Sequence, residues 1–251
     1  STDTSGTSGS TDTSGTSGST DTSGTGGSTD TSGTSGSTDT SGTGGSQPQM
    51  VFDDYVLDIA TLSNNEQTSL IGDAAIVNTA SGSAIQFDGN RDMVKLGRLA
   101  EFEDSEQIAF TVEFTRDEAD GSSQRLVWNK GNFGLAVSRD GLIAYVANND
   151  GKFTKGFRAD NIGLNDTDAH QITLMVDQVS DHLQVVVDGA VVIDETNTDF
   201  DFIDANGGEE WEWTLGTANN RFVDGEISAF AIDDDVQFID IQAAQAEDLF
   251  G

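Results

Sequence analysis

The chain has 251 residues, with 44 acidic and 11 basic side chains, a formal net charge of −33 and no cysteine. Because nucleic acids and anionic lipids bind through Lys and Arg, this charge argues against both as partners. Disulfides and thiolate metal sites are excluded, and no apolar run of about 18 residues predicts insertion into a membrane.

Residues 1–45 consist of five nine-residue units of the type STDTSGTSG or STDTSGTGG. They contain no aliphatic, aromatic or basic side chain, so they cannot bury enough apolar surface to offset the entropy lost on ordering. Calcium-binding β-rolls also have a nine-residue period, but they need an aliphatic residue in each unit. We therefore predict a low-complexity linker over residues 1–49 and a single folded domain over residues 50–251.

The folded domain is predicted to be all-β. In residues 108–114, Ile108, Phe110, Val112 and Phe114 fall on one face and Ala109, Thr111 and Glu113 on the other, which is typical of a half-buried strand. Hairpin turns are expected at residues 138–141 and at Asp188-Gly189. After Asp240, a plausible N-cap, residues 242–249 are predicted to form a short C-terminal helix. Predicted strands are Ser83–Phe87, Ile108–Phe114, Arg125–Trp128, Gly134–Val137, Leu142–Ala147, Gln171–Val176, Leu183–Val187 and Glu226–Ile232.

The order of several motifs resembles that of laminin G-like domains in the concanavalin A-like lectin and glucanase family. These motifs are Ala84-Ile-Gln-Phe-Asp-Gly89, Met93-Val-Lys-Leu96, Phe110-Thr-Val-Glu-Phe114, Leu183-Gln-Val-Val-Val-Asp-Gly189 and Phe222-Val-Asp-Gly-Glu-Ile227. The resemblance covers residues 51–251, although Ala169 replaces the tryptophan that usually precedes the histidine. It implies a two-sheet antiparallel jelly-roll β-sandwich, commonly with structural calcium, that serves adhesion or carbohydrate binding.

One candidate calcium site is the segment with Asp88, Asn90 and Asp92. Oxygen side chains at alternate positions suit a hard cation. The alternative is that Asp88 and Gly89 only form a hairpin turn.

A second candidate calcium site uses acidic residues from the two ends of the folded domain. The ends of such sandwiches lie side by side, which would bring Asp53 and Asp54 close to the run Asp233, Asp234 and Asp235. From these we take Asp53, Asp54 and Asp234 as candidate ligands. Exposed carboxylates tolerated without a metal are the alternative.

A glycosidase is the enzymatic alternative. Glycosidases of this fold carry Glu-x-Asp-x-Glu or a similar run on one strand, and Asp199, Asp201 and Asp204 have that arrangement with Asp in place of both Glu. Shorter side chains withdraw the carboxyl groups from the bond to be cleaved, so catalysis is disfavoured.

Candidate saccharide-binding residues are aromatic or basic. Tyr145 and Trp211 are the candidates for stacking against sugar rings. By alternation, Trp128 shares a face with Leu126 and is expected in the core, as is Trp213 beside Leu215. The basic cluster Lys152, Lys155 and Arg158 can meet acidic groups of a sugar or pair with neighbouring carboxylates.

Together these patterns predict a secreted or cell-surface module, tethered to a larger protein, that binds a polysaccharide or other glycan without cleaving it and is stabilised by calcium. A protein–protein adhesion domain is the first alternative and a glycosidase the second.

Overall fold

The computed structural model describes residues 50–62, 68–102, 104–129, 132–147, 155–196, 212–218 and 221–240. All of them belong to the second of two compact units, Ser46–Gly251. Several predicted features lie outside the described residues: the linker, the C-terminal helix, Lys152, Trp211 and the run from Asp199 to Asp204.

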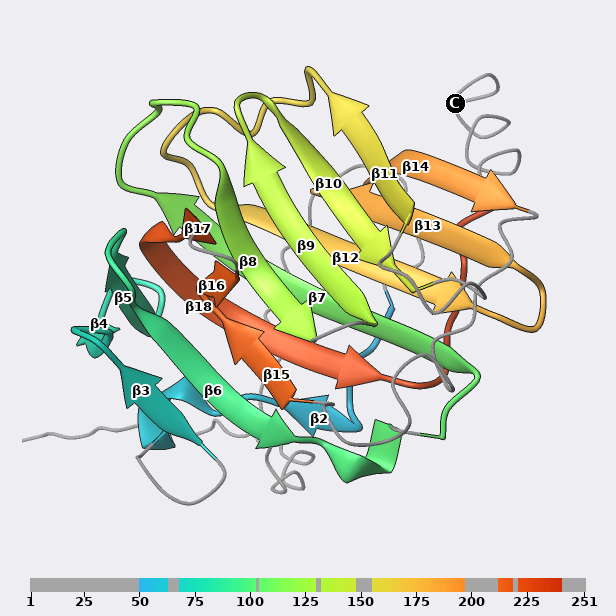
Figure 1. Ribbon diagram of the computed structural model, residues 1–251, viewed down its shortest axis with the longest axis horizontal. Helices are drawn as coiled ribbons and strands as arrows, with labels where there is room; N and C mark the ends of the chain where they lie inside the picture. The colour runs from blue at the N-terminus through green and yellow to red at the C-terminus, as the bar shows by residue number, and fades with distance from the viewer. Residues whose placement is uncertain are drawn as a thin grey trace, which may run out of the picture. The chain divides into compact units, whose positions relative to one another are not determined.

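Two antiparallel sheets stack on each other, as the sequence predicts for a β-sandwich (Figure 1). The seven-stranded sheet has the order β11-β10-β9-β8-β15-β6-β3. In chain order its strands are β3 (Ser69–Ile71), β6 (Met93–Arg98), β8 (Gln124–Asn129), β9 (Phe133–Ser138), β10 (Gly141–Val146), β11 (Lys155–Asp160) and β15 (Glu212–Leu215).

The eight-stranded sheet has the order β14-β13-β12-β7-β18-β5-β4, with β2 paired to β18. Its strands are β2 (Tyr55–Val56), β4 (Ala75–Asn78), β5 (Ser83–Asp88), β7 (Gln107–Arg116), β12 (His170–Asp177), β13 (His182–Val187), β14 (Ala190–Thr196) and β18 (Asp224–Asp233). A small ribbon, β16 (Thr217–Ala218) with β17 (Arg221–Phe222), and the short 3-10 turns η2 (Ile59–Thr61) and η3 (Ala100–Phe102) complete the described elements. None of the described helices is long and apolar enough to cross a membrane.

All eight predicted strands are present, most of them one or two residues longer than expected. Both predicted hairpins are confirmed: residues 138–141 join β9 to β10, and Asp188-Gly189 joins β13 to β14. Asp188 and Gly189 have φ angles of 50° and 85°, the left-handed conformation that a two-residue hairpin turn requires.

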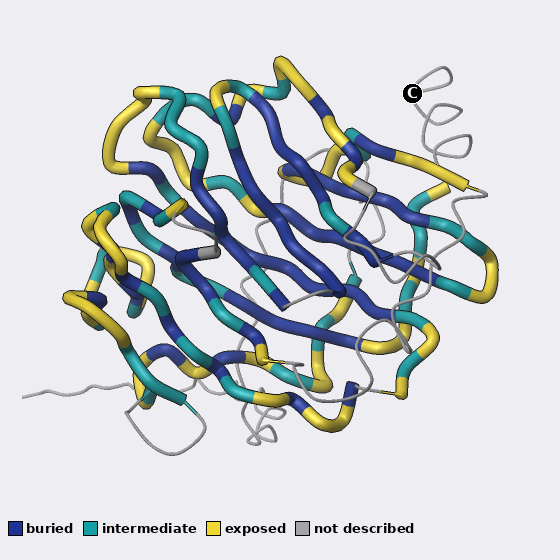
Figure 2. Tube along the Cα trace, viewed as in Figure 1, coloured by how far each residue is buried: buried dark blue, intermediate teal, exposed yellow. Residues whose placement is uncertain are grey.

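Most strand residues in the middle of the sheets are buried (Figure 2), and the core between the sheets is rich in aromatic residues. Trp213 of β15 is fully buried, as predicted, and its ring centroid lies 5.5 Å from that of Phe110 and 6.0 Å from that of Phe133. Phe110 comes from the eight-stranded sheet and the other two rings from the seven-stranded sheet, so the contact between Phe110 and Trp213 joins the layers. Such ring pairs contribute about 0.5–1.5 kcal/mol each beyond the burial of area.

Candidate functional site

The outer face of the seven-stranded sheet carries two aromatic side chains in one row. Strand pairing places Tyr145 of β10 opposite both Gly134 of β9 and Gly156 of β11, and Trp128 of β8 opposite Gly134 from the other side. Both aromatic residues are half-buried, and their ring centroids are 6.0 Å apart with planes inclined at 75°. Two amphipathic rings therefore lie on this face of the sandwich.

Glycine at position 134 makes room for the Trp128 ring. A β carbon at this position would lie closer than 3.0 Å to Cε3 and Cζ3 of the ring. The indole therefore rests directly on the backbone of β9, and the missing side chain sets its height above the sheet.

Arg125 completes this surface, and we call Arg125, Trp128 and Tyr145 the aromatic platform. Arg125 pairs with Ala136, so it projects to the same outer face. Its Cζ atom lies 4.5 Å from the centroid of Trp128 and 4.7 Å from that of Tyr145, within the range of cation–π attraction. The residue is only 7% exposed, and its Nε and Nη1 atoms have no hydrogen-bond partner. The pKa of Arg125 is lowered, mainly because the residue is buried; the charge of and a hydrogen bond to Tyr145 oppose this shift, and the charge of Arg221 adds to it.

The prediction that Trp128 belongs to the core is wrong. The register between β8 and β9 shifts between Arg125 and Val127, so an irregularity interrupts the alternation at Leu126. Leu126 and Val127 both point into the core, so the residues after them face the opposite side from the one that strict alternation would give. Trp128 consequently shares the outer face with Arg125, three residues earlier, rather than the inner face with Leu126.

The predicted basic cluster lies partly at the same face. Lys152 is outside the described residues, and Lys155 begins β11. Arg158 pairs with Ile143, the outward neighbour of Tyr145 on β10, and its guanidinium lies 3.6 Å from the Asp160 carboxylate. Both partners are exposed, so this ion pair contributes little stability.

The Asp88 to Asp92 segment forms the turn between β5 and β6. Asp92 is 1% exposed, and its two oxygens accept the backbone N–H groups of Asp73 (2.7 Å) and Asp88 (2.9 Å). Asp88 in turn accepts the N–H of Asn90 at 2.8 Å. These hydrogen bonds are the ones expected if the segment simply forms a hairpin turn. Calcium binding by Asp88, Asn90 and Asp92 stays a prediction.

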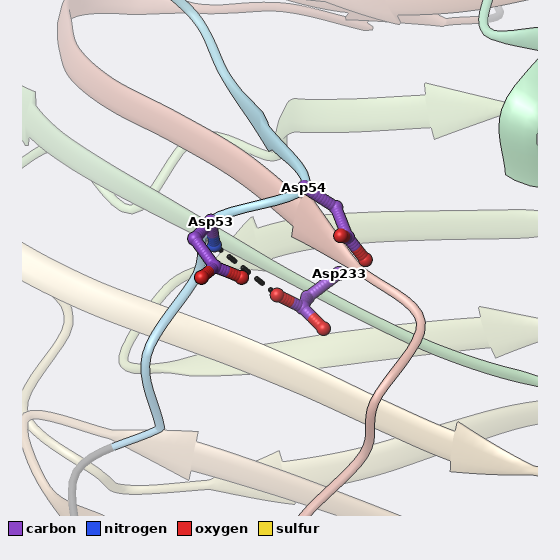
Figure 3. Close-up of side chains that lie close together, drawn as sticks. All are labelled: Asp53, Asp54 and Asp233. Atoms are coloured by element: carbon purple, nitrogen blue, oxygen red, sulfur yellow. Dashed lines mark hydrogen bonds between the residues drawn. The ribbon is translucent and has the colours of Figure 1, made fainter.

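The two ends of the folded domain meet, and their carboxylates converge (Figure 3). Tyr55 of β2 pairs with Ile232 of β18, so the residues next to them come together. Carboxylate oxygens of Asp53, Asp54 and Asp233 all lie within 4.8 Å of one another. Oxygen donors in this number suit a hard divalent cation. The cluster can therefore hold a metal ion.

Backbone hydrogen bonds position two of these three carboxylates. Asp53 donates its N–H to Asp233 at 3.2 Å, and Asp235 donates to the other oxygen of Asp233 at 2.8 Å. The carboxylate of Asp54 accepts the N–H of Asp234 at 3.2 Å. The side chain of Asp234, the predicted ligand, instead accepts the hydroxyl of Ser105 at 3.0 Å. Within this run, Asp233 is thus the residue whose carboxylate joins those of Asp53 and Asp54.

A separate hollow of about 360 Å³ lies on the outer face of the eight-stranded sheet. Phe52, Met175 and Ile239 are among its lining residues. Gln184 of β13 donates to the carbonyl of Ile239 (3.0 Å) and accepts its N–H (2.9 Å), which fixes the segment after β18 against the sheet. Sequence reasoning did not find this hollow, because it depends on how the two ends of the domain cross the sheet.

His170 has a structural environment. Its ring nitrogens lie 2.7 Å from the carboxylate of Asp188 and 2.9 Å from that of Asp166. Burial alone would lower the pKa of His170, but the hydrogen bonds and charges of the two carboxylates outweigh burial and raise it above 6.5. The histidine therefore ties the turn before β12 to the β13–β14 hairpin.

No family model matches the chain, and no curated protein matches its sequence. Solved structures do match its fold. The CBM40 module of the Ruminococcus gnavus IT-sialidase, bound to α2,3-sialyllactose, is similar with a TM-score of 0.51 and 17% identity, over 62% of this chain and 91% of that one.

Toxin binding domains are similar to the same extent. The binding domain of Paraclostridial Mosquitocidal Protein 1 has a TM-score of 0.55 and 13% identity, over 73% of this chain and 46% of its own. The receptor-binding domain of a botulinum neurotoxin C/D mosaic has a TM-score of 0.53 and 13% identity, over 68% of this chain and 43% of its own. This chain thus spans under half the length of those toxin chains. At these identities the matches establish a lectin-like β-sandwich, with which the laminin G-like and concanavalin A-like class is compatible.

Proposed function

We propose that residues 50–251 form a non-catalytic glycan-binding module of laminin G-like type, and that its ligand binds at the aromatic platform. In this proposal residues 1–49 serve as a low-complexity tether to a larger secreted or cell-surface protein. The observation that carries the proposal is the pair of half-buried rings, Trp128 and Tyr145, on the outer face of a sheet. A sugar ring stacks on such rings through its apolar C–H face, while its hydroxyls bond to polar groups around it.

The structural neighbours support a binding rather than a catalytic role. One of them is described in complex with sialyllactose, and the botulinum neurotoxin type C match is described as dependent on two ganglioside molecules for cell entry. Both ligands are glycans with a sialic acid. Sialyllactose is therefore a rational first probe for this chain, with lactose as its neutral counterpart.

Calcium is proposed as a structural ion at the acidic cluster of Asp53, Asp54 and Asp233. Three converging carboxylates repel one another, and a divalent cation between them removes that repulsion. The ion would fasten β2 to the end of β18, so its expected effect is on stability rather than on ligand contact.

Titration calorimetry with sialyllactose and lactose tests the binding role. Trp128→Ala and Tyr145→Ala should each weaken binding about fivefold or more, because stacking on one ring contributes about 1 kcal/mol. Phe52→Ala is the matched control, since it removes a ring from the hollow on the opposite sheet. Reducing ends assayed in the same samples should not increase with time.

Three outcomes would contradict the proposal. Loss of affinity in Phe52→Ala alone would move the site to the eight-stranded sheet. Release of new reducing ends would make the protein a glycosidase. No affinity for any glycan on an array would favour the protein–protein adhesion alternative.

A further inference from the structure

Basic residues are unevenly divided between the two sheets. Strands of the eight-stranded sheet contain one basic residue, Arg116, against eight acidic ones. Strands of the seven-stranded sheet contain five basic residues against two acidic ones, Asp160 and Glu212. Those five are Lys95, Arg98, Arg125, Lys155 and Arg158. In a chain of net charge −33, this sheet is the layer on which an anion meets least repulsion.

Arg125 differs from the other buried arginine of the described residues. Arg116 is 3% exposed and leaves only Nη2 without a partner: Nε donates to the carbonyl of Leu164 at 2.9 Å and Nη1 to that of Ser122 at 3.1 Å. Arg125 is 7% exposed, yet the same two atoms of its guanidinium have no acceptor. Arg116 is thus a structural arginine, whereas the fold does not use the Nε and Nη1 donors of Arg125.

Acidic side chains are abundant in this chain, but none of those that the structure describes satisfies these two donors. Within the described ranges, the salt bridges involve Lys95, Arg158 and the two histidines, and none includes Arg125. Arg221, whose charge lowers the pKa of Arg125, donates a hydrogen bond to the hydroxyl of Ser123 at 3.0 Å. Two buried guanidinium donors without an acceptor are costly, because these N–H groups have lost water without gaining a partner. An anionic ligand at the platform would supply the missing acceptor.

We infer that the aromatic platform selects saccharides that carry a carboxylate, and that Arg125 is the residue that recognises it; this inference rests on the proposed glycan site. The rings of Trp128 and Tyr145 hold the guanidinium from two sides, so its position is fixed before the ligand arrives. A neutral sugar stacks on the same rings but leaves the donors unpaired. Selectivity for the acid therefore comes from the arginine and affinity for the sugar from the rings.

The test compares two probes that differ in charge: trigalacturonate and its full methyl ester, which has the same rings and no carboxylate. Wild type should bind the acid at least about tenfold more tightly than the ester, since hydrogen bonds to charged groups are strong. Arg125→Gln should bring the ratio of the two affinities close to one. Arg125→Lys keeps the charge and should retain part of the ratio.

Arg116→Gln is the matched control, because it removes a buried arginine from the opposite sheet. It should lower the unfolding midpoint and leave the acid-to-ester ratio unchanged. Thermal unfolding of each variant separates loss of fold from loss of recognition.

Two results would overturn the inference, and they differ from failure of the proposed function. If Arg125→Gln keeps the wild-type ratio, or if wild type does not prefer the acid, the platform binds sugars without recognising a carboxylate. If Trp128→Ala leaves binding of both probes intact, the glycan site itself lies elsewhere.

Discussion

Replacing Gly134 by alanine tests the geometry of the platform without removing any functional group. The added β carbon would lie closer than 3.0 Å to two atoms of the Trp128 ring, whereas carbon atoms in contact prefer about 3.5–4.0 Å. The backbone at Gly134 pairs with β8 on one side and β10 on the other, so the indole must move. Such overpacking costs about 1–3 kcal/mol.

We expect Gly134→Ala to lower the midpoint of thermal unfolding by about 2–12 °C, since 1 kcal/mol corresponds to about 2–4 °C in a domain of this size. Displacement of the ring should also weaken glycan binding about fivefold, the contribution of one stacked ring. Circular dichroism melts and titration calorimetry measure the two effects.

Gly156→Ala is the matched control, because Gly156 lies in the same row on the other side of Tyr145. A β carbon there would lie 3.3 Å from Cγ2 of Ile143 and 3.5 Å from Cε1 of Tyr145, which is close to ordinary contact. Its melting midpoint should change by less than half as much. Equal shifts in the two variants, or no shift in Gly134→Ala, would refute the position assigned to the Trp128 ring.

Three further predictions concern stability. Because the pKa of His170 is raised in the folded state, its protonation stabilises the fold fully below the unfolded value of 6.5, and this stability is lost as pH rises through the raised pKa. The free energy of unfolding in urea should therefore decline with pH in wild type, and His170→Gln should lack this decline. A decline of equal size in the variant would contradict the prediction. Millimolar calcium should raise the unfolding midpoint above that in chelator, and Asp233→Asn should remove this shift while Asp88→Asn keeps it; the reverse result would place the ion in the β5–β6 turn. Deletion of residues 1–49 should leave the unfolding midpoint unchanged in the same melts, and a fall of several degrees would show that they are not merely a tether.

Most of the fold could be predicted because its strands alternate. Residues 108–114 are an example: their apolar side chains point into the core from β7, as the period of two predicts. Strands at the sheet edges were harder to predict from the sequence. Three-residue β3 and four-residue β4 are too short to carry a period, and β11 was noticed only for its charges.

The candidate site could be predicted only in part. Tyr145 was found from its alternation with Ile143, and the meeting of Asp53 and Asp54 with the acidic run at the other end follows from how such sandwiches close. Arg125 and Trp128 were missed. A single irregular residue in β8 reverses the face to which the Trp128 side chain points, and no local sequence pattern predicts this irregularity. The lack of an acceptor for Arg125 depends on which strands surround it, which sequence alone does not state.

The most direct test of the central claim is to map the ligand on the protein by NMR. Sialyllactose added to isotopically labelled protein should shift the indole N–H signal of Trp128 and the amide signals of Arg125, Gly134 and Tyr145, because these lie at the platform. Shifts confined to Phe52 and the other residues of the hollow on the eight-stranded sheet, or no shifts at saturating ligand, would contradict the account.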